Sequence, residues 1–242
     1  MAKQDKGWYP DAIKIPIPIF PDDNARGGYG DIPQGSMEAV AVVQHVIQGF
    51  ASTLNNWMQT GGGPQISCHF TIARDGTVYQ YASVFDATWH AGDTEKTPQW
   101  ELYDGTNPNR QSIGLEMEGF SAQVSYADYV YNDNNPWPEK MTQSVIDVTK
   151  WALEQHGIKA SPDTVIGHFM LNSQNRKHDP GDAWPIERIL DELRGYKKIE
   201  KPDDAGQKDR HGNINEHDAN LELAEQKLLA AIQLIKSAKK AD

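Results

Sequence analysis

Residues 67–92 read SCHFTIARDGTVYQYASVFDATWHAG, and the first half of this stretch predicts a β-hairpin. Residues 69–73 and 77–81 are rich in the β-branched and aromatic side chains that favour strands. The tripeptide RDG at 74–76 separates them, and Asp-Gly supplies the positive φ angles of a tight turn. We therefore expect two antiparallel strands here.

Two apolar runs on either side of this stretch predict buried strands. Residues 37–43 read MEAVAVV and are followed by the dipeptide QH, so the first strand should deliver His45 at its end. Residues 112–117 read SIGLEM, and alternation along a strand places Glu116 and Glu118 on one face. Two interpretations stay open: a desolvated carboxylate suited to a general base, or an edge strand whose glutamates face water.

Helical spacing of apolar residues predicts helices over residues 50–59, 138–156 and 184–193. Between the last two, residues 165–166 form a short strand that leads to His168. Residues 1–36 are rich in Pro, Gly and Asp, which interrupt regular structure. We expect this segment to be an irregular arm over the body of the domain.

Composition excludes several classes of protein. The 242 residues are 38% apolar and 24% charged, as in an ordinary soluble globular protein. A formal charge of -11 has the wrong sign for holding nucleic acid or anionic lipid. The single cysteine, Cys68, permits no intramolecular disulfide and is expected to be a small buried hydrophobe.

Nothing in the sequence predicts export or membrane insertion. The apolar stretch near the N-terminus is short and interrupted by prolines, which is unlike a signal peptide. No run reaches the roughly 18 apolar residues that a membrane helix needs. We expect a cytoplasmic protein in the producing cell, without a signal peptide.

The composition changes near the C-terminus, so we expect the main domain to cover residues 1–196. Residues 197–217 are charged and almost free of large apolar side chains, which indicates a linker. Residues 218–242 carry apolar positions three and four residues apart and predict an amphipathic C-terminal helix with a short heptad seam. Docking on its own domain, self-association and disorder all remain open for this helix.

Three residues are candidates for a metal site. His45 and His168 each follow a β-branched run, and sites in open α/β sheets collect at strand ends. Asp179 lies in the loop NRKHDPG at 175–181, which can fold back toward His168. Two imidazoles and one carboxylate leave zinc an open position, the arrangement of a catalytic site. Spacing alone does not show that the two histidines lie close together. The alternative role for an aspartate in this loop is to cap the N-terminus of the following helix, which suits Asp182 better than Asp179.

Four sequence blocks carry a resemblance to a known family. VVQH, SCHFTIARDGTVYQYASVFDATWHAG, SIGLEMEG, and VIGH followed by RKHDPG occur in an order and spacing that resemble the type 2 N-acetylmuramoyl-L-alanine amidases, relatives of peptidoglycan recognition proteins. The resemblance covers roughly residues 8–193. It implies an α/β domain with a central mixed β-sheet flanked by helices. It also implies a zinc ion in a surface cleft and cleavage of the amide between N-acetylmuramic acid and L-alanine.

The resemblance also implies roles for single residues. His45 and His168 match the two zinc histidines, and Asp179 falls where members place Asp or Cys as third ligand. Glu116 matches the catalytic carboxylate, which takes a proton from water and returns it to the leaving amine. Lys177 matches the lysine ahead of the third ligand, which stabilises the oxyanion of the tetrahedral intermediate.

Further candidates lie beside these positions. His178 departs from the family pattern, where a small or polar residue is common; neighbours in an extended segment point apart, so Asp179 is kept as the ligand. His69, Trp89 and His90 resemble residues lining the cleft and are the substrate-binding candidates. Two interpretations stay open for His90: contact with substrate or metal-bound water, or a structural role. For Trp89, core packing is the stronger interpretation.

The resemblance leaves three functions to separate. The leading one is a cell-wall-degrading endolysin, which acts on bacterial peptidoglycan after release from the producing cell. A cytosolic amidase that recycles anhydro-muropeptides is the nearest alternative. A non-catalytic peptidoglycan-binding module is the third, although all three ligand positions hold residues that bind zinc.

Overall fold

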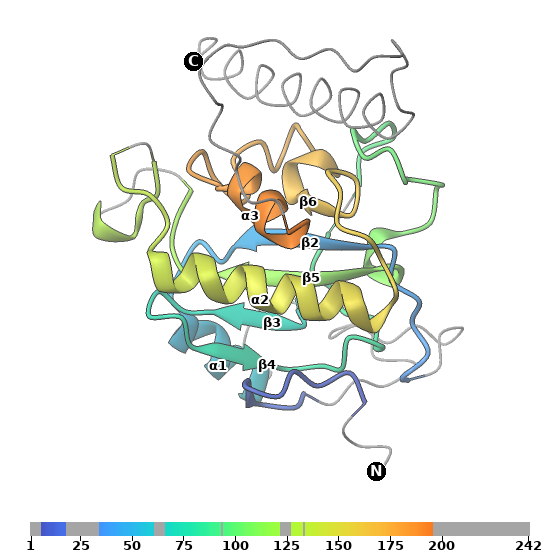
Figure 1. The fold of residues 1–242 in the computed structure, drawn as a ribbon, viewed down its shortest axis with the longest axis horizontal. Coiled ribbons are helices and arrows are strands. Elements are labelled where there is room, and N and C mark those ends of the chain that lie inside the picture. The colour runs from blue at the N-terminus through green and yellow to red at the C-terminus, as the bar shows by residue number, and fades with distance from the viewer. Residues whose placement is uncertain are drawn as a thin grey trace, which may run out of the picture. The chain divides into compact units, whose positions relative to one another are not determined.

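A six-stranded mixed β-sheet with the order β1-β4-β3-β5-β2-β6 runs through the protein (Figure 1). The computed structural model describes residues 6–17, 34–60, 66–92, 94–121, 127–132 and 134–195. The strands are β1 (Ile13–Lys14), β2 (Ala41–Val46), β3 (Phe70–Ile72), β4 (Val78–Gln80), β5 (Ser112–Met117) and β6 (Val165–Gly167). The α-helices are α1 (Ala51–Thr60), α2 (Glu139–Gln155) and α3 (Ile186–Leu193), and short 3-10 helices are η2 (Pro108–Arg110), η3 (Ala127–Tyr129) and η4 (His168–Met170).

Helices cover both faces of this sheet, as the resemblance implies. In Figure 1, α2 lies across the near face in contact with β2, β3 and β5, while α1 lies behind β3. The Gln44 side chain binds Thr149 of α2 with Nε2 to Oγ1 at 3.1 Å, so Gln44 points to the near face. Because side chains alternate along a strand, His45 points to the opposite face. The metal candidates therefore lie on the side of the sheet away from α2.

The predicted hairpin and the SIGLEM strand are confirmed. β3 and β4 pair antiparallel, and Gly76 in the turn between them has a φ of 89°. Strand β5 has the predicted bounds and lies between β3 and β2. The interpretation of an edge strand with water-facing glutamates is therefore wrong, because both edges of β5 are paired.

Strand β2 begins later than predicted and includes His45. The backbone N–H of Met37 binds the carbonyl of Phe85, and that of Ala39 binds the ring of His156, both outside the sheet. Met37 and Ala39 are nevertheless buried, which produces the apolar pattern of a strand without strand pairing. The strand itself starts at Ala41 and carries His45 as its fifth residue.

The N-terminal arm contributes a strand, contrary to the expectation that it is irregular. Ile13 and Lys14 form β1, which pairs in parallel with β4. The N–H groups of Ile15 and Ile17 continue this contact to the carbonyls of Gln80 and Tyr81. Pairing with the exposed edge of a hairpin supplies hydrogen bonds that the arm's own composition does not predict. Residues 1–5 and 18–33 of the arm, the predicted linker and the C-terminal helix lie outside the described residues.

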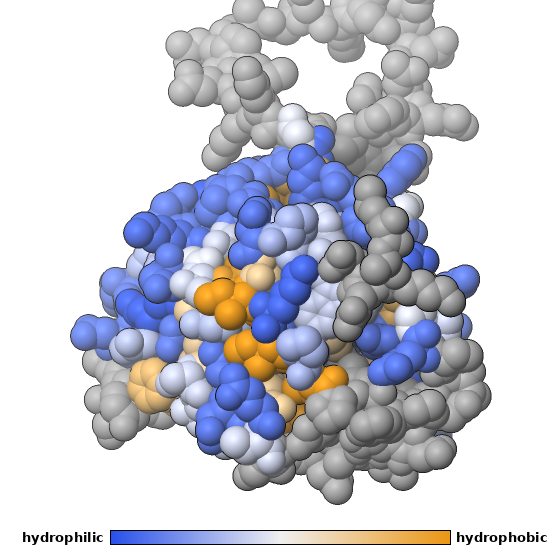
Figure 2. Space-filling model, turned by 90° about the horizontal axis from the view of Figure 1, so that it is seen from below, coloured by the Kyte–Doolittle hydropathy of each residue, from blue (hydrophilic) through white to orange (hydrophobic). Residues whose placement is uncertain are grey.

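Most large apolar side chains of the described residues lie in the interior, while Ile13, Ile66 and Leu102 are exposed. Met1–Arg194 form one compact unit, and of the second unit, Gly195–Asp242, only Gly195 is described. Figure 2 views the first unit from the side of β4 and shows apolar groups scattered among polar ones. Within the described part of the chain, no helix is both long and apolar enough to span a membrane.

Candidate metal centre

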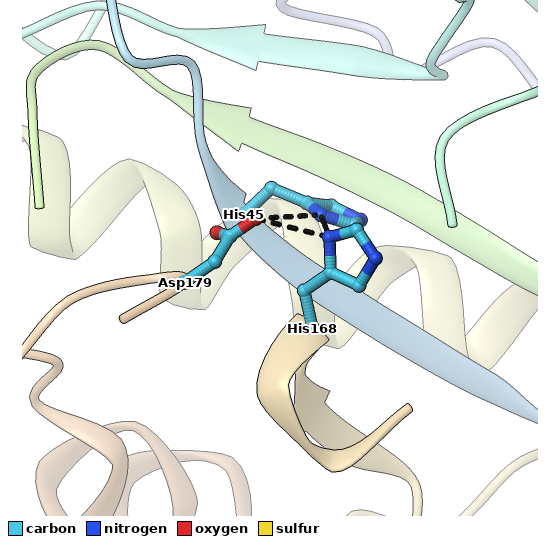
Figure 3. A group of neighbouring side chains, drawn as sticks. All are labelled: His45, His168 and Asp179. Carbon is cyan, nitrogen blue, oxygen red and sulfur yellow. Dashed lines mark hydrogen bonds and ion pairs between the residues drawn. The ribbon is translucent and has the colours of Figure 1, made fainter. Parts of the chain in front are cut away.

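Three side chains from separate elements converge on one point (Figure 3). His45 lies on β2, and His168 opens η4 directly after β6. β6 pairs in parallel with β2, so both strands bring their carboxyl ends to the same edge of the sheet. The loop that carries Asp179 is tied to this edge, because the Val46 N–H donates to Asp179 Oδ1 at 2.8 Å. The sequence-predicted trio is thus brought together.

The spacing of the three candidate ligand atoms suits a cation with tetrahedral coordination. His45 Nδ1 lies 2.9 Å from His168 Nδ1, and Asp179 Oδ2 lies 3.0 Å from His168 Nδ1 and 3.6 Å from His45 Nδ1. Ligands about 2.0–2.1 Å from a tetrahedral zinc are separated by about 3.3 Å from one another. The three atoms fit such an ion with displacements of a few tenths of an ångström.

Hydrogen bonds on the outer sides of the two rings leave both Nδ1 atoms as electron-pair donors. His168 Nε2 donates to the carbonyl of Ala91 at 2.8 Å, and His45 Nε2 binds His90 Nδ1 at 3.0 Å. A neutral imidazole with its proton on Nε2 has a lone pair on Nδ1. Two such lone pairs at 2.9 Å repel each other unless a cation lies beside them. The donor set therefore fits a divalent metal.

Burial keeps the site ready to bind a cation. Removal from water, followed by the charge of His168, lowers the pKa of His45 from 6.5 to about 4. Burial on its own would raise the pKa of Asp179, but the adjacent His168 and His45 rings outweigh it and hold this pKa below its ordinary value. At neutral pH His45 is therefore uncharged and Asp179 is ionised.

Glu116 lies beside the trio on the same face of the sheet. It pairs with His45 across β5 and β2, and with Thr71 across β5 and β3. Burial, and then the negative charge of Asp179, raise the pKa of Glu116 well above its ordinary value, against an opposing effect of Arg176. A carboxylate with a raised pKa accepts protons near neutral pH, as a general base must.

The second glutamate of this strand has a structural position. Glu118 Oε1 accepts from the N–H of Ala51 at the start of α1, and its Oε2 accepts from the N–H of Arg74 in the hairpin turn. Both carboxylate oxygens are used to join α1 to the hairpin. Strand alternation alone does not separate Glu116 from Glu118, because both lie on one face of the strand; the family resemblance selected Glu116.

The loop before Asp179 presents two adjacent cations. Lys177 is exposed, and it is Arg176 whose charge lowers the pKa values of Glu116 and His45. Sequence reasoning missed Arg176; its place three residues before the third ligand is the only signal. Sequence pattern alone does not decide which of two adjacent, exposed basic residues acts on the carboxylate.

His178 and Asp182 form a separate pair, with His178 Nδ1 3.7 Å from Asp182 Oδ1. His178 is thus outside the group of three side chains that could hold a metal ion. The expectation that Asp182 suits the N-cap of the last helix is wrong, because α3 begins after Pro185 with no side-chain cap. Pro185 fits the start of the helix, where a backbone donor is not needed.

The three substrate-binding candidates are placed in or near the interior. His69 is fully buried: its Nε2 donates to the carbonyl of Asp86, and its Nδ1 accepts from the N–H of Gly114. His90 is also buried, and Trp89 is partly exposed. Substrate contact stays a prediction for all three residues. The burial of His69 and His90 does not favour it. Cys68 is buried in an apolar cluster, as expected.

Acidification should destabilise the protein through His69. Burial lowers the pKa of His69 from 6.5 to about 4. Between these two pH values the imidazole is protonated in the unfolded chain and neutral in the folded protein. The stabilising effect is complete above the ordinary pKa and is lost as pH falls toward the lowered one. From about pH 7.5 to about pH 5, the free energy of unfolding should fall by about 2 kcal/mol through this residue.

Urea unfolding of metal-free protein at the two pH values measures this loss. In His69→Gln the amide nitrogen can still donate to the Asp86 carbonyl but does not titrate, so its free energy of unfolding should fall by less. Equal losses in wild type and variant would show that His69 is not responsible.

Comparisons with known proteins agree with this geometry. A family model described as Amidase_2, N-acetylmuramoyl-L-alanine amidase, matches residues 36–182. N-acetylmuramoyl-L-alanine amidase A of Achromobacter lyticus is 24% identical over 177 residues, covering 66% of this chain and 86% of that protein. The 1,6-anhydro-N-acetylmuramyl-L-alanine amidase AmpD of Haemophilus influenzae is 28% identical over 131 residues, covering 54% and 60% of the two chains.

A solved structure shares the fold. The crystal structure of a selenomethionine AmpD derivative superposes with a TM-score of 0.55 at 21% identity, covering 78% of this chain and 97% of that one. The match confirms the mixed sheet flanked by helices. The family model covers more than half of the sequence and includes His45, Glu116, His168 and Asp179. The chain belongs to the Amidase_2 family of N-acetylmuramoyl-L-alanine amidases.

Proposed function

We propose that this protein hydrolyses the amide bond between N-acetylmuramic acid and L-alanine in a zinc-dependent reaction, with His45, His168 and Asp179 as the metal ligands. The observation that carries the proposal is the pair of Nδ1 atoms, 2.9 Å apart, each freed for a metal by a hydrogen bond from its own Nε2. Family membership supports the substrate class.

The chain's own residues divide the chemistry between them. When bound, zinc supplies a Lewis acid that polarises the amide carbonyl and makes water a better nucleophile. Glu116 takes the proton from the attacking water and returns it to the leaving nitrogen, because an amide nitrogen leaves poorly until it is protonated. Lys177, two residues before Asp179 and exposed, stabilises the negative charge that develops on the amide oxygen.

Two measurements test this proposal. Metal analysis should find one zinc per chain, and mass analysis of fragments released from purified peptidoglycan should show free L-alanine amino termini. A wild-type protein that binds sacculi but holds no zinc and releases no peptides would support the non-catalytic binding module instead.

We further propose that the substrate in the cell is polymeric peptidoglycan, which the protein degrades as an endolysin after leaving the cytoplasm where it is made. The alternative is a soluble anhydro-muropeptide, which the name of the Haemophilus influenzae relative specifies for that protein. Rates on intact sacculi and on soluble anhydro-muropeptides separate the two. Turnover of the soluble substrate alone would overturn the endolysin proposal.

Replacing Lys177 tests which of the two adjacent cations acts in catalysis. Lys177→Ala should lower kcat by about 10²-fold, the cost of one oxyanion contact, while zinc content stays unchanged. Arg176→Ala is the matched control, since it removes the neighbouring charge from the same exposed loop. Steady-state rates on a soluble muropeptide measure both. A larger loss of kcat in Arg176→Ala than in Lys177→Ala would reassign the role to Arg176.

A further inference from the structure

The Nε2 atoms of His45 and His168 both bind one dipeptide, His90-Ala91. His45 Nε2 meets the ring of His90, and His168 Nε2 donates to the carbonyl of Ala91. One contact is made by a side chain and the other by the backbone. The orientation of both rings therefore depends on where residues 90 and 91 are held.

A single buried amide holds this dipeptide. Asn109 Oδ1 accepts from the N–H of His90 at 2.9 Å and from the N–H of Ala91 at 2.7 Å. The Asn109 residue is only 4% exposed, and its own N–H is bound by Asn107 Oδ1 at 3.0 Å. Because one oxygen binds two consecutive N–H groups, the dipeptide cannot turn without losing both hydrogen bonds.

The ring of His90 is held in one orientation by β5. His90 Nε2 lies 3.2 Å from the carbonyl of Ser112, which can only accept, so the proton of this ring is on Nε2. The ring also lies over Gly114, where an added Cβ would stand 2.4 Å from His90 Cγ. His90 Nδ1 is thereby left as an acceptor that faces His45.

We propose that His90 and Ala91, held by Asn109, form one clamp that fixes both metal histidines with Nδ1 toward the metal. The donor order runs from His45 Nε2 to His90 Nδ1 and from His168 Nε2 to the Ala91 carbonyl. Asn109 is a positioning residue that touches neither metal nor ligand. His90 then orients the ring of His45 and does not make the predicted contact with substrate.

This inference rests on the proposed zinc site. The clamp makes zinc binding more favourable. Rings already turned to the metal lose less conformational freedom on binding, and an Nε2–H that donates makes the opposite nitrogen a stronger ligand. Loss of such a partner typically weakens metal affinity about 10- to 100-fold. Loss of Asn109 should affect both rings, because it releases both contacts at once.

A pair of substitutions at residue 109 tests the clamp. Asn109→Ala removes the acceptor and should raise the zinc Kd by about 10- to 100-fold, measured by competition with a chelator. Asn109→Asp keeps an oxygen that accepts from two N–H groups, so its Kd should stay within about threefold of wild type. Asn132→Ala is the control, since Asn132 Oδ1 also accepts from two backbone N–H groups, those of Asn134 and Asn135. Its Kd should not change.

A second measurement needs no metal and covers the case in which Asn109→Ala does not fold. Nitrogen-15 spectra of the metal-free wild type should show protonated Nε2 atoms on both His45 and His168, protected from exchange with solvent. His90→Leu should lose that protection at His45, and His90→Asn, whose side-chain oxygen takes the place of Nδ1, should restore it.

The outcomes separate the clamp from the function. An unprotonated Nε2 on either ring of the wild type, or an unchanged zinc Kd in a folded Asn109→Ala, would overturn the clamp. A wild type that binds no zinc yet shows both protected Nε2–H groups would overturn the proposed zinc-dependent function and leave the clamp standing.

Discussion

Replacement of His168 by alanine is expected to remove bound zinc and, with it, all measurable amide hydrolysis. His168 Nδ1 is the atom nearest to both other ligand atoms, at 2.9 Å from His45 Nδ1 and 3.0 Å from Asp179 Oδ2. Without it, two ligands remain, fewer than the three that catalytic zinc sites use. Loss of several kcal/mol of transition-state stabilisation lowers the rate by about 10³-fold or more.

Elemental analysis of the purified variant measures the metal, and circular dichroism establishes that it is folded. His178→Ala is the matched control, because this histidine stands next to Asp179 in the sequence but pairs with Asp182. It should keep both zinc and activity. Zinc retained in His168→Ala, or lost in His178→Ala, would contradict the assignment of ligands.

Glu116→Gln is expected to lower kcat by about 10³-fold while leaving zinc content unchanged, since a general base contributes about 10² to 10⁴. Glutamine has nearly the same shape as glutamate but does not accept a proton. The wild-type rate should fall as pH decreases through the raised pKa of Glu116, because the protonated carboxyl is not a base. The acid limb should therefore lie above the ordinary glutamate value, about 4.3.

Glu118→Gln is the control for this variant. Its carboxylate binds the N–H groups of Ala51 and Arg74, so the substitution should reduce stability and leave kcat near wild type. Stopped assays on a soluble muropeptide, with zinc measured on the same samples, compare the two. Full turnover in Glu116→Gln would refute the general-base role, and so would a larger loss of kcat in Glu118→Gln.

Local signals in the sequence were enough for several elements. The turn between β3 and β4 follows from Asp75-Gly76, because a positive φ is needed there and glycine adopts it freely. β5 has the predicted bounds, and α1 and α2 lie within a residue of theirs. These elements depend on neighbours in the chain, so a pattern of residues a few positions apart predicts them.

Strand pairing determined the arrangement around the metal position, and no local pattern contains it. β6 lies beside β2 although His45 and His168 are 123 residues apart. The register of β2 and β5 then sets Glu116 next to His45. The sequence supplied the candidates through four ordered blocks, but only the sheet order shows that their side chains meet.

By itself, the sequence determined the family, the mixed α/β fold and the set of residues able to hold a metal, because residue type and order carry that information. The tertiary structure alone decided which partners each histidine has. The Nδ1 atoms of His45 and His168 lie 2.9 Å apart while His90 and the Ala91 carbonyl bind their Nε2 atoms, whereas both ring nitrogens of His69 are bound in the interior. The role of an imidazole depends on which partner binds each ring nitrogen, and those partners come from distant parts of the chain.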